Sequence, residues 1–454
     1  MLFSSVTFLY YFLPLLIILY FILKKHRNNL LLVFSLFFYF YGEPKFILVL
    51  LSSIIINYYF SKWIYNNPTK KRMLLILSLI INLGILFYFK YFNFIIECTN
   101  DILNLDINIL NISLPLGISF FTFQAISYVV DVYLNKVKPA KNIFEFGTYL
   151  SLFPQLVAGP IVRYETIADE LKSRKITTEM FASGIKRFII GLSKKVILAN
   201  TLGEIVTIFA SLSQKTIISN WLVGISYSLQ IYFDFSGYSD MAIGLGLMLG
   251  FRFLENFNYP FIASSITDFW RRWHISLSSF FRDYVYIPLG GNRVSKKRWI
   301  FNLFVVWFLT GLWHGASYNF ILWGLYFFIL LILEKLFLNK FIKNKIFSHI
   351  YTIILVIISF VIFRETDISE LFITLKSMFG FNNLKWINIE TIYYLKNFSV
   401  FLIISIILST PIVKLIKQKI NKPIIEYVGC FILLVIVTSY LVSSSSNPFL
   451  YFRF

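Results

Sequence analysis

The sequence predicts an all-α, polytopic membrane protein with roughly eleven transmembrane helices. Of its 454 residues, 58% are apolar and only 14% are charged, whereas soluble domains carry about 25% charged residues. Apolar runs of near-spanning length recur along the whole chain, which is the signal of membrane helices. No Gly-, Ser- or Pro-rich linker interrupts them, so we expect a single transmembrane domain over residues 1–454.

The net charge is +20, from 42 basic and 22 acidic residues. The basic residues gather in short loops between apolar runs, where they favour the cytoplasmic side of a membrane, so we expect no nucleic-acid partner. The two cysteines, Cys98 and Cys430, are far apart and lack metal-ligand spacing. The sequence therefore indicates no disulfide framework, no metal site and no permanently bound cofactor.

Five basic clusters define the expected topology. They lie at 24–27, 70–72, 296–298, 335–345 and 414–422. With all five in the cytoplasm, a first span at 3–23 is retained and begins outside the cell. A hairpin of 30–41 and 46–60 around Gly42-Glu43-Pro44 follows, then a span at 73–89 and an external loop at 98–111.

The same rule applied to the C-terminal part predicts spans at 350–362, 398–413 and 424–442, with an extracellular aromatic tail at 443–454. Three central segments, 113–133, 181–200 and 261–291, are too polar for lipid-facing spans. They suit cavity-lining, re-entrant or interfacial helices. No fixed-period repeat is visible, which counts against an inverted-repeat transporter.

His314 lies between two apolar runs, 299–312 and 320–333. Because basic loops bracket both runs, they form a hairpin with His314 near its apex. Fourteen helical residues rise about 21 Å, less than the roughly 30 Å of a hydrocarbon core, which places the imidazole at membrane depth. An ionisable group there is costly and points to function; Gly315 and Ala316 would leave room for a ligand. The alternative is a helix-turn histidine satisfied by a backbone carbonyl.

A second histidine lies in the segment 268–276, Asp-Phe-Trp-Arg-Arg-Trp-His-Ile-Ser. At helical spacing Trp270, Trp273, His274 and Leu277 share one face. Arg271 and Arg272 follow Asp268, their expected partner, by about one turn, and could hold an anionic or thioester donor. The alternative is an interfacial helix with snorkelling arginines and an aromatic belt.

Two histidines suit acyl transfer, because neutral imidazole can take a proton from a hydroxyl and return it to a leaving thiolate. No nucleophile elbow, Ser-His-Asp order or phosphate-binding glycine loop is evident. Other polar residues in apolar surroundings either line the same cavity or bond neighbouring helices. They are Gln124, Asp131, Asp234, Ser236 and Asp240.

The tail 447–454 is aromatic and carries Tyr451. It is either an interfacial anchor or a segment that folds into the external mouth of the cavity and offers the Tyr451 hydroxyl. A disordered terminus would be more polar.

Six motifs together resemble the membrane-bound O-acyltransferase family, in its bacterial alginate-O-acetylating branch, with a D-alanyl-transferring branch as cousin. They lie at 113–120, 153–160, 234–240, 269–277, 286–291 and 310–315. The resemblance implies a ring of helices around a thin centre in a bacterial plasma membrane. It implies that His314 is catalytic, that His274 is the second family histidine, and that Tyr451 is an acyl relay. His26 and His349 match nothing and are expected to be solvated.

The resemblance also implies a cytoplasmic acyl thioester donor, acetyl-CoA in acetylating members, and an extracellular SGNH-type acyltransferase partner. The expected function is transfer of an acyl group, acetyl first, across the membrane for O-acylation of an envelope polysaccharide or peptidoglycan. D-alanyl transfer to teichoic acids, lipid or polymer export, and a scaffolding role are the alternatives.

Overall fold

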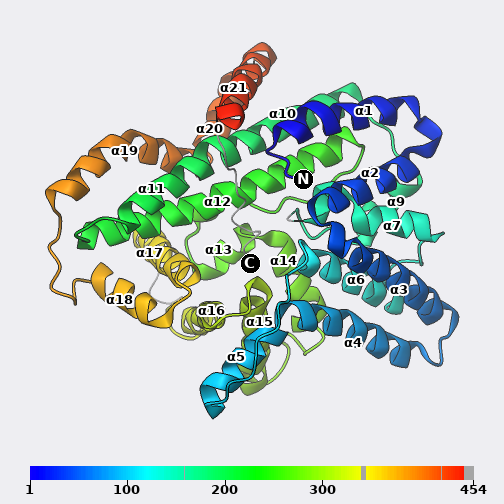
Figure 1. The fold of residues 1–454 in the computed structure, drawn as a ribbon, viewed down its shortest axis with the longest axis horizontal. Coiled ribbons are helices and arrows are strands. Elements are labelled where there is room, and N and C mark those ends of the chain that lie inside the picture. The colour runs from blue at the N-terminus through cyan, green and yellow to red at the C-terminus, as the bar shows by residue number, and fades with distance from the viewer. Residues whose placement is uncertain (158, 339–343, 421, 444–454) are drawn as a thin grey trace. The chain divides into compact units, whose positions relative to one another are not determined.

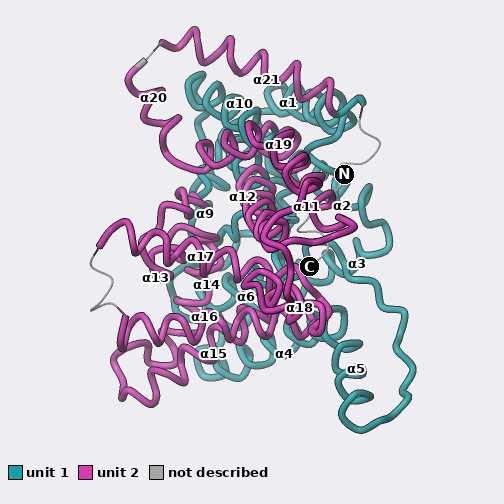
Figure 2. The backbone as a smooth tube through the Cα atoms, turned by 90° about the vertical axis from the view of Figure 1, so that its left-hand side faces the viewer, with its two compact units in different colours: residues 1–192, 238–254, 441–453 teal, residues 193–237, 255–440, 454 magenta. Residues whose placement is uncertain are grey.

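The computed structural model describes residues 1–157, 159–338, 344–420 and 422–443, and all regular structure in these ranges is helical (Figure 1). The chain folds into two compact units (Figure 2). Unit 1 holds Met1–Leu192 and Tyr238–Leu254, and unit 2 holds Ser193–Gly237 and Glu255–Tyr440. The expected single domain over the whole chain stays a prediction.

The helices of unit 1 are α1 (Leu13–Ile22), α2 (Arg27–Gly42), α3 (Ile47–Asn66), α4 (Lys71–Lys90), α5 (Phe92–Leu103), α6 (Ile118–Tyr133), α7 (Ile143–Ser151), α8 (Phe153–Leu156), α9 (Tyr164–Lys172) and α10 (Thr178–Ser193). The helix α12 (Ile217–Met248) has its first part in unit 2 and its last part in unit 1.

The remaining helices belong to unit 2, which also holds all but the last residues of α21. They are α11 (Asn200–Ala210), α13 (Ile266–Arg272), α14 (Ile275–Phe281), α15 (Lys296–His314), α16 (Tyr318–Leu336), α17 (Lys345–Arg364), α18 (Ile368–Met378), α19 (Ile389–Leu408), α20 (Ile412–Ile420) and α21 (Pro423–Ser443).

Among the described residues, six helices are long and apolar enough to cross a membrane. They are Pro44–Asn66, which contains α3, and α4, α16, α17, α19 and α21. The helical stretches Phe8–Ile22 and Lys24–Gly42, bent by 107° at their junction, qualify together as a seventh. The expected spans at 46–60, 73–89, 350–362 and 424–442 are confirmed as apolar helices. The total of eleven stays a prediction.

Two expected boundaries were wrong. The predicted span 398–413 is interrupted after Leu408, and α20 begins at Ile412. Pro411 explains the break, because proline lacks the N–H that would continue the helix and restricts the residue before it. In the expected loop 98–111, the helix α5 continues to Leu103 and ends where Asn104 adopts φ +50°, a conformation that asparagine tolerates better than most residues.

The core of unit 1 combines aromatic clusters with paired amides. Phe3, Phe8, Phe38 and Phe153 pack with ring centroids 5.0–6.1 Å apart. Between α3 and α4, the amides of Asn57 and Asn82 donate to each other at 3.0 and 2.8 Å. Each amide also donates to a carbonyl of its own helix. These bonds satisfy buried polar groups that would otherwise face apolar surroundings.

The core of unit 2 is built on the antiparallel pair α15 and α16, with α13 and α17 packed against α16 (Figure 1). At the crossing, a Cβ on Gly311 would lie 2.4 Å from the carbonyl oxygen of Phe320, and a Cβ on Gly324 would lie 2.4 Å from that of Trp307. Only glycine permits this approach of the two backbones. The helical hairpin expected around His314 is therefore confirmed.

Candidate active site

The segment that carries His274 is fixed first at the N-terminus of α13. Ser265 Oγ accepts a hydrogen bond from the backbone N–H of Asp268 at 2.9 Å, as in an N-cap. The Asp268 carboxylate in turn accepts from Arg272 Nε at 2.9 Å. The partnership expected for Asp268 is confirmed for Arg272.

One prediction was wrong: no continuous helical face carries Trp270, Trp273, His274 and Leu277. The helix α13 ends at Arg272, Trp273 is extended, and His274 has φ +44° at the start of α14. Long-range backbone bonds impose the break: Asn258 N–H donates to Arg272 O at 2.9 Å, and Ile275 N–H donates to Asn256 O at 3.0 Å. A left-handed histidine is strained, and such strain concentrates at functional sites.

Asn256 determines the tautomer of His274. Its Oδ1 accepts from the backbone N–H of Ser276 at 3.1 Å and from the Ser276 hydroxyl at 2.9 Å. Because this atom accepts from a backbone N–H, it is the amide oxygen. His274 Nδ1 lies 3.3 Å from it and must therefore donate. A neutral imidazole has one N–H, so Nε2 carries the lone pair.

His274 is completely buried, and its Nε2 has no hydrogen-bond partner among the residues that the structure describes. The ring of Phe235 stands edge-on to it at 4.6 Å. Burial lowers the pKa of the His274 imidazole far below its usual range, because the charged form loses its hydration. The imidazole is thus a neutral base with one free lone pair.

His314 is the last residue of α15 and is 2% exposed. Its ring meets those of Trp323 and Phe363 nearly at right angles, with centroids 4.8 and 5.3 Å away. Asn319 secures the position of Phe363 by donating to its carbonyl oxygen at 2.9 Å. The expected space beside Gly315 is absent, since a Cβ there would lie 2.1 Å from the Phe320 ring. The glycine admits this ring and leaves no room for a ligand at that point.

The structure brings both predicted histidines against one residue, Trp313. Its ring centroid lies 5.5 Å from that of His274 and 5.0 Å from that of His314. Trp270 extends the aromatic wall by packing on Trp323 at 5.5 Å. The expected aromatic wall therefore exists, although tertiary packing builds it from several helices rather than one helical face.

Glu334 is a site residue that the sequence reasoning missed. It is fully buried on α16, and its carboxylate accepts three hydrogen bonds. They come from the backbone N–H of Ile266 at 2.6 Å, and from the N–H and hydroxyl of Thr267 at 3.0 Å each. A carboxylate at a helix N-terminus is favourable. Glu334 thus fixes the start of α13, the helix that leads to His274.

A buried ion pair lies next to Phe235, the residue whose ring packs on His274. Lys195 Nζ lies 2.7 Å from Asp234 Oδ1, with both side chains at most 4% exposed. Lys195 also donates to Asn200 at 3.0 Å. Asp234 precedes Phe235, which packs on His274, so the pair holds this part of α12 beside the imidazole.

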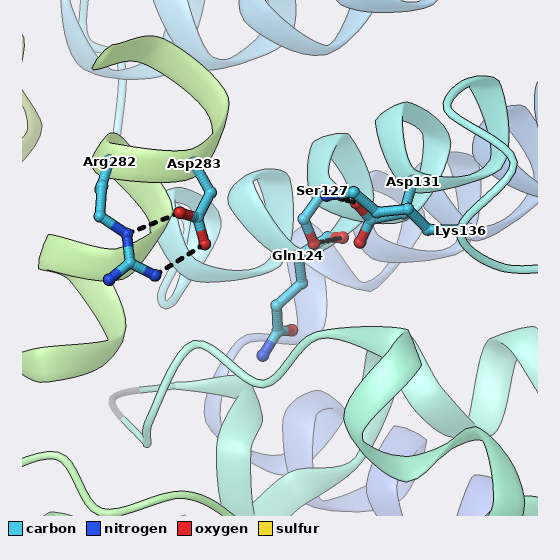
Figure 3. Close-up of polar contacts among 6 residues, drawn as sticks. All are labelled: Gln124, Ser127, Asp131, Lys136, Arg282 and Asp283. Carbon is cyan, nitrogen blue, oxygen red and sulfur yellow. Dashed lines mark hydrogen bonds and ion pairs between the residues drawn. The ribbon is translucent and has the colours of Figure 1, made fainter. Parts of the chain in front are cut away.

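The remaining predicted polar residues divide into two kinds. In unit 1, Asp131 pairs with Lys136 at 3.3 Å (Figure 3) and Asp240 pairs with Arg187 at 2.8 Å, so structural pairing accounts for them. The side chain of Gln124 is different: neither amide atom has a partner within the described ranges, as is also true of the Ser236 hydroxyl. Figure 3 also shows, in unit 2, Arg282 donating to both oxygens of Asp283 at 2.7 and 3.1 Å.

The structure places neither His26 nor His349 in this cluster. Tyr451 lies outside the described residues. His26 is exposed, as expected. His349 was expected to be solvated but is half-buried, with Nδ1 3.0 Å from the carbonyl oxygen of Ala263.

The cluster can perform base chemistry. The partner of His274 Nδ1 is the Asn256 amide, which does not titrate. A fixed tautomer directs the lone pair of Nε2, and the aromatic surroundings exclude water, which strengthens polar interactions. Within the described ranges, no three His, Cys, Asp or Glu side chains are grouped to hold a metal ion.

Comparisons with known proteins cover the part of the chain that holds these residues. The model of the membrane-bound O-acyltransferase family matches residues 140–366, a range that contains both histidines, Asn256 and Glu334. The probable alginate O-acetylase of Pseudomonas aeruginosa is 44% identical over 314 residues, which cover 68% of this chain and 60% of that protein.

Two other relatives differ in their named acceptors. The peptidoglycan O-acetyltransferase of Helicobacter pylori is 37% identical over 345 residues, 69% of this chain and 66% of its own length. The teichoic acid D-alanyltransferase of Bacillus subtilis is 32% identical over 259 residues, which cover 54% of this chain and 65% of that protein. The family match and the six apolar helices together identify a multi-pass membrane protein. This chain belongs to the membrane-bound O-acyltransferase family.

Proposed function

We propose that this protein is an O-acyltransferase of a bacterial plasma membrane. It takes an acyl group, acetyl in the first place, from a cytoplasmic thioester and delivers it for O-acylation of an envelope polysaccharide or peptidoglycan. One observation carries the proposal: a buried, neutral His274 with a fixed tautomer shares Trp313 with His314. The relatives named as alginate and peptidoglycan O-acetylating proteins support it.

The chemistry requires a hydroxyl nucleophile, a base and a leaving thiolate. A histidine Nε2 accepts the hydroxyl proton while the oxygen attacks the thioester carbon. The tetrahedral intermediate collapses, the C–S bond breaks, and the thiolate takes the proton from the imidazolium. We assign this proton transfer to His314 and the positioning of the donor, or sharing of the proton, to His274. General base catalysis of this kind contributes about 10²- to 10⁴-fold to a rate.

The proposed donor is acetyl-CoA, and the proposed first acceptor is the hydroxyl of Tyr451. A phenol of pKa about 10 leaves more readily than a sugar alkoxide, so an acyl-tyrosine ester transfers its acyl group onward downhill. An extracellular SGNH-type acyltransferase would collect that group. This arrangement places the C-terminal tail and the N-terminus outside the cell and the donor inside, in keeping with the basic loops.

D-alanyl transfer to teichoic acid is the second candidate, favoured by the likeness to the Bacillus subtilis D-alanyltransferase. The two candidates differ in donor. Membranes that contain this protein would release thiol from acetyl-CoA in one case and from a D-alanyl-charged carrier protein in the other. The neighbouring genes offer an independent check, since an SGNH protein favours acetylation and an adenylating ligase with a carrier favours D-alanylation.

The catalytic proposal is tested by His314→Ala in cells, with His349→Gln as the matched histidine control. We expect the His314 variant, at normal abundance, to lose acylation of the envelope polymer while the control retains it. Full acylation of the envelope polymer by the His314→Ala variant would contradict a catalytic role for His314. Export and scaffolding would then be the remaining candidate functions. Mass spectrometry of the C-terminal peptide tests the relay: acylation of the polymer that survives Tyr451→Phe would remove Tyr451 from the mechanism.

A further inference from the structure

Unit 1 contains a cavity of about 380 Å³ that plays no part in the site above. Its walls are the turn Lys24–His26, the first residues of α2, and the stretch that ends α9 and continues to Arg174. This volume lies within the roughly 300–1,000 Å³ range of small-molecule sites.

The charge of the lining is entirely of one sign. Lys24, Lys25, Arg27, Lys172 and Arg174 line the cavity, and none of the described aspartates or glutamates does. Lys172 has an acidic neighbour, Asp169, at 3.2 Å, but that carboxylate is 97% exposed. Surface pairs of this kind are screened by solvent. The cavity therefore favours an anion.

Arg174 is built into the wall rather than solvated like a loop residue. Its Nε donates to the Tyr20 hydroxyl at 2.7 Å and to Leu249 O at 3.1 Å. Its Nη1 donates to Asn28 Oδ1 at 2.8 Å and to Glu170 O at 2.9 Å. The guanidinium also lies 4.5 Å from the ring centroid of Phe251. These contacts hold the cation in one orientation.

One nitrogen of this fixed guanidinium is left over. Arg174 Nη2 is buried and has no hydrogen-bond partner among the described residues. A buried donor of a charged group without a partner costs more than a neutral one. Arg174 also lines the cavity, and guanidinium groups bind phosphate oxygens particularly well.

The two walls are tied together around the cavity. Asn28 Nδ2 donates to the carbonyl oxygen of Leu171 at 2.7 Å. Arg27 Nε donates to Tyr20 O at 3.3 Å, with its guanidinium 4.8 Å from the Tyr20 ring centroid. The first turn of α2 also belongs to the wall, and N–H groups at a helix N-terminus favour phosphate. A basic loop that served only to orient the chain in a membrane would need none of these bonds.

We propose that this cavity binds a phosphate group of a ligand on the side of the basic loops. The chemistry fits two sources: the phosphates of a nucleotide-bearing thioester donor, and the headgroup of an anionic phospholipid. The site does not depend on the proposed acyl transfer, because its evidence is the cavity, its charge and the fixed arginine. Its test measures binding, so the two proposals can fail separately.

The experiment uses the full-length protein in nanodiscs and two pairs of probes. Calorimetry compares coenzyme A with pantetheine, which lacks the phosphates. Native mass spectrometry compares retained phosphatidylglycerol with retained phosphatidylcholine. The test variant is Lys24→Gln/Lys25→Gln with Arg27→Gln. The matched control, Lys45→Gln/Lys70→Gln/Arg72→Gln, removes two lysines and one arginine that are exposed elsewhere in unit 1. Thermal melting of both variants checks that they fold.

We expect the test variant to bind one anionic probe about tenfold more weakly than the wild type does. The control should bind both probes with nearly the affinity of the wild type. Loss of coenzyme A binding alone identifies the donor phosphates, and loss of phosphatidylglycerol alone identifies the lipid headgroup. If the triple variant melts at a lower temperature than Lys24→Gln/Lys25→Gln alone, the double variant replaces it in both binding measurements. The proposal is overturned if the wild type binds coenzyme A no better than pantetheine and phosphatidylglycerol no better than the zwitterionic phosphatidylcholine. It is also overturned if the control weakens binding as much as the test variant.

Discussion

His274 Nδ1 and Asn256 Oδ1 lie 3.3 Å apart, and the same oxygen receives two hydrogen bonds from Ser276. Removing the oxygen with Asn256→Ala frees the imidazole to exchange tautomers and rotate. We expect thiol release from the acyl donor to fall about 10- to 100-fold, because the imidazole that positions the donor or shares the proton loses its fixed orientation. Turnover in proteoliposomes with a thiol reagent measures this.

The control for Asn256 is Asn258→Ala in the same segment. The Asn258 side chain is exposed, and its backbone supplies the bonds to Arg272. Equal losses of turnover in the two variants would mean that the segment is damaged in general and would contradict a specific role for the Asn256 amide.

Glu334→Ala should destabilise unit 2, since it leaves three donors on Ile266 and Thr267 without their acceptor. We expect a loss on the order of 3 kcal/mol in unfolding free energy. Denaturant titration in detergent measures it. The exposed Glu204 provides the control, and Glu204→Ala should remain within about 0.5 kcal/mol of the wild type. A stable Glu334→Ala would show that the carboxylate does not hold α13.

Gly311→Ala should separate α15 from α16, because its Cβ would lie 2.4 Å from the Phe320 carbonyl oxygen. Overpacking of this kind costs about 1–3 kcal/mol, and we expect a lower melting temperature with reduced activity. Gly84→Ala is the matched control, because among the described residues no atom beyond the backbone of its own helix lies within 4 Å of the added methyl group. If both variants melt with the wild type, the close crossing of the two helices is wrong.

The stability of the protein should fall in acid through His274. Burial lowers the pKa of this imidazole to about 3, below the roughly 6.5 of an unfolded histidine. The unfolded chain therefore binds the proton first as the pH drops. The free energy of unfolding is therefore unaffected by His274 above pH about 6.5. It falls as the pH drops towards 3, by at most about 1.4 kcal/mol per pH unit.

His274→Gln isolates that contribution. Denaturation midpoints at pH 7 and pH 5 should differ less in the variant than in the wild type, because glutamine does not titrate. Identical differences in the two proteins would assign the acid sensitivity to other groups.

The sequence predicted the hairpin at His314 because two apolar runs between basic loops leave the chain few alternatives in a membrane. It failed at His274, where the local pattern favours one helix but backbone bonds from Asn256 and Asn258 break it. These bonds join residues 14 and 19 positions apart, and no periodicity in a short window reveals them. Tertiary contacts therefore decided the geometry of the second histidine.

Glu334 escaped prediction for a different reason. It ends an apolar run and precedes Lys335, so the sequence places it with the charges of a membrane surface. Only the fold shows that it faces the N-terminus of α13. A local signal for that N-terminus does exist, since Ser265 and Asp268 have the spacing of a helix cap, and it would have placed the start of the helix.

The reciprocal amides of Asn57 and Asn82 bear on how the protein is made. A span that entered the bilayer alone would expose its amide to hydrocarbon, which offers no hydrogen bond. The ribosome completes α3 before α4, so we expect α3 to stay near the insertion machinery until its partner arrives. We therefore expect an order of assembly that depends on synthesis, in which the two helices enter the lipid as one unit.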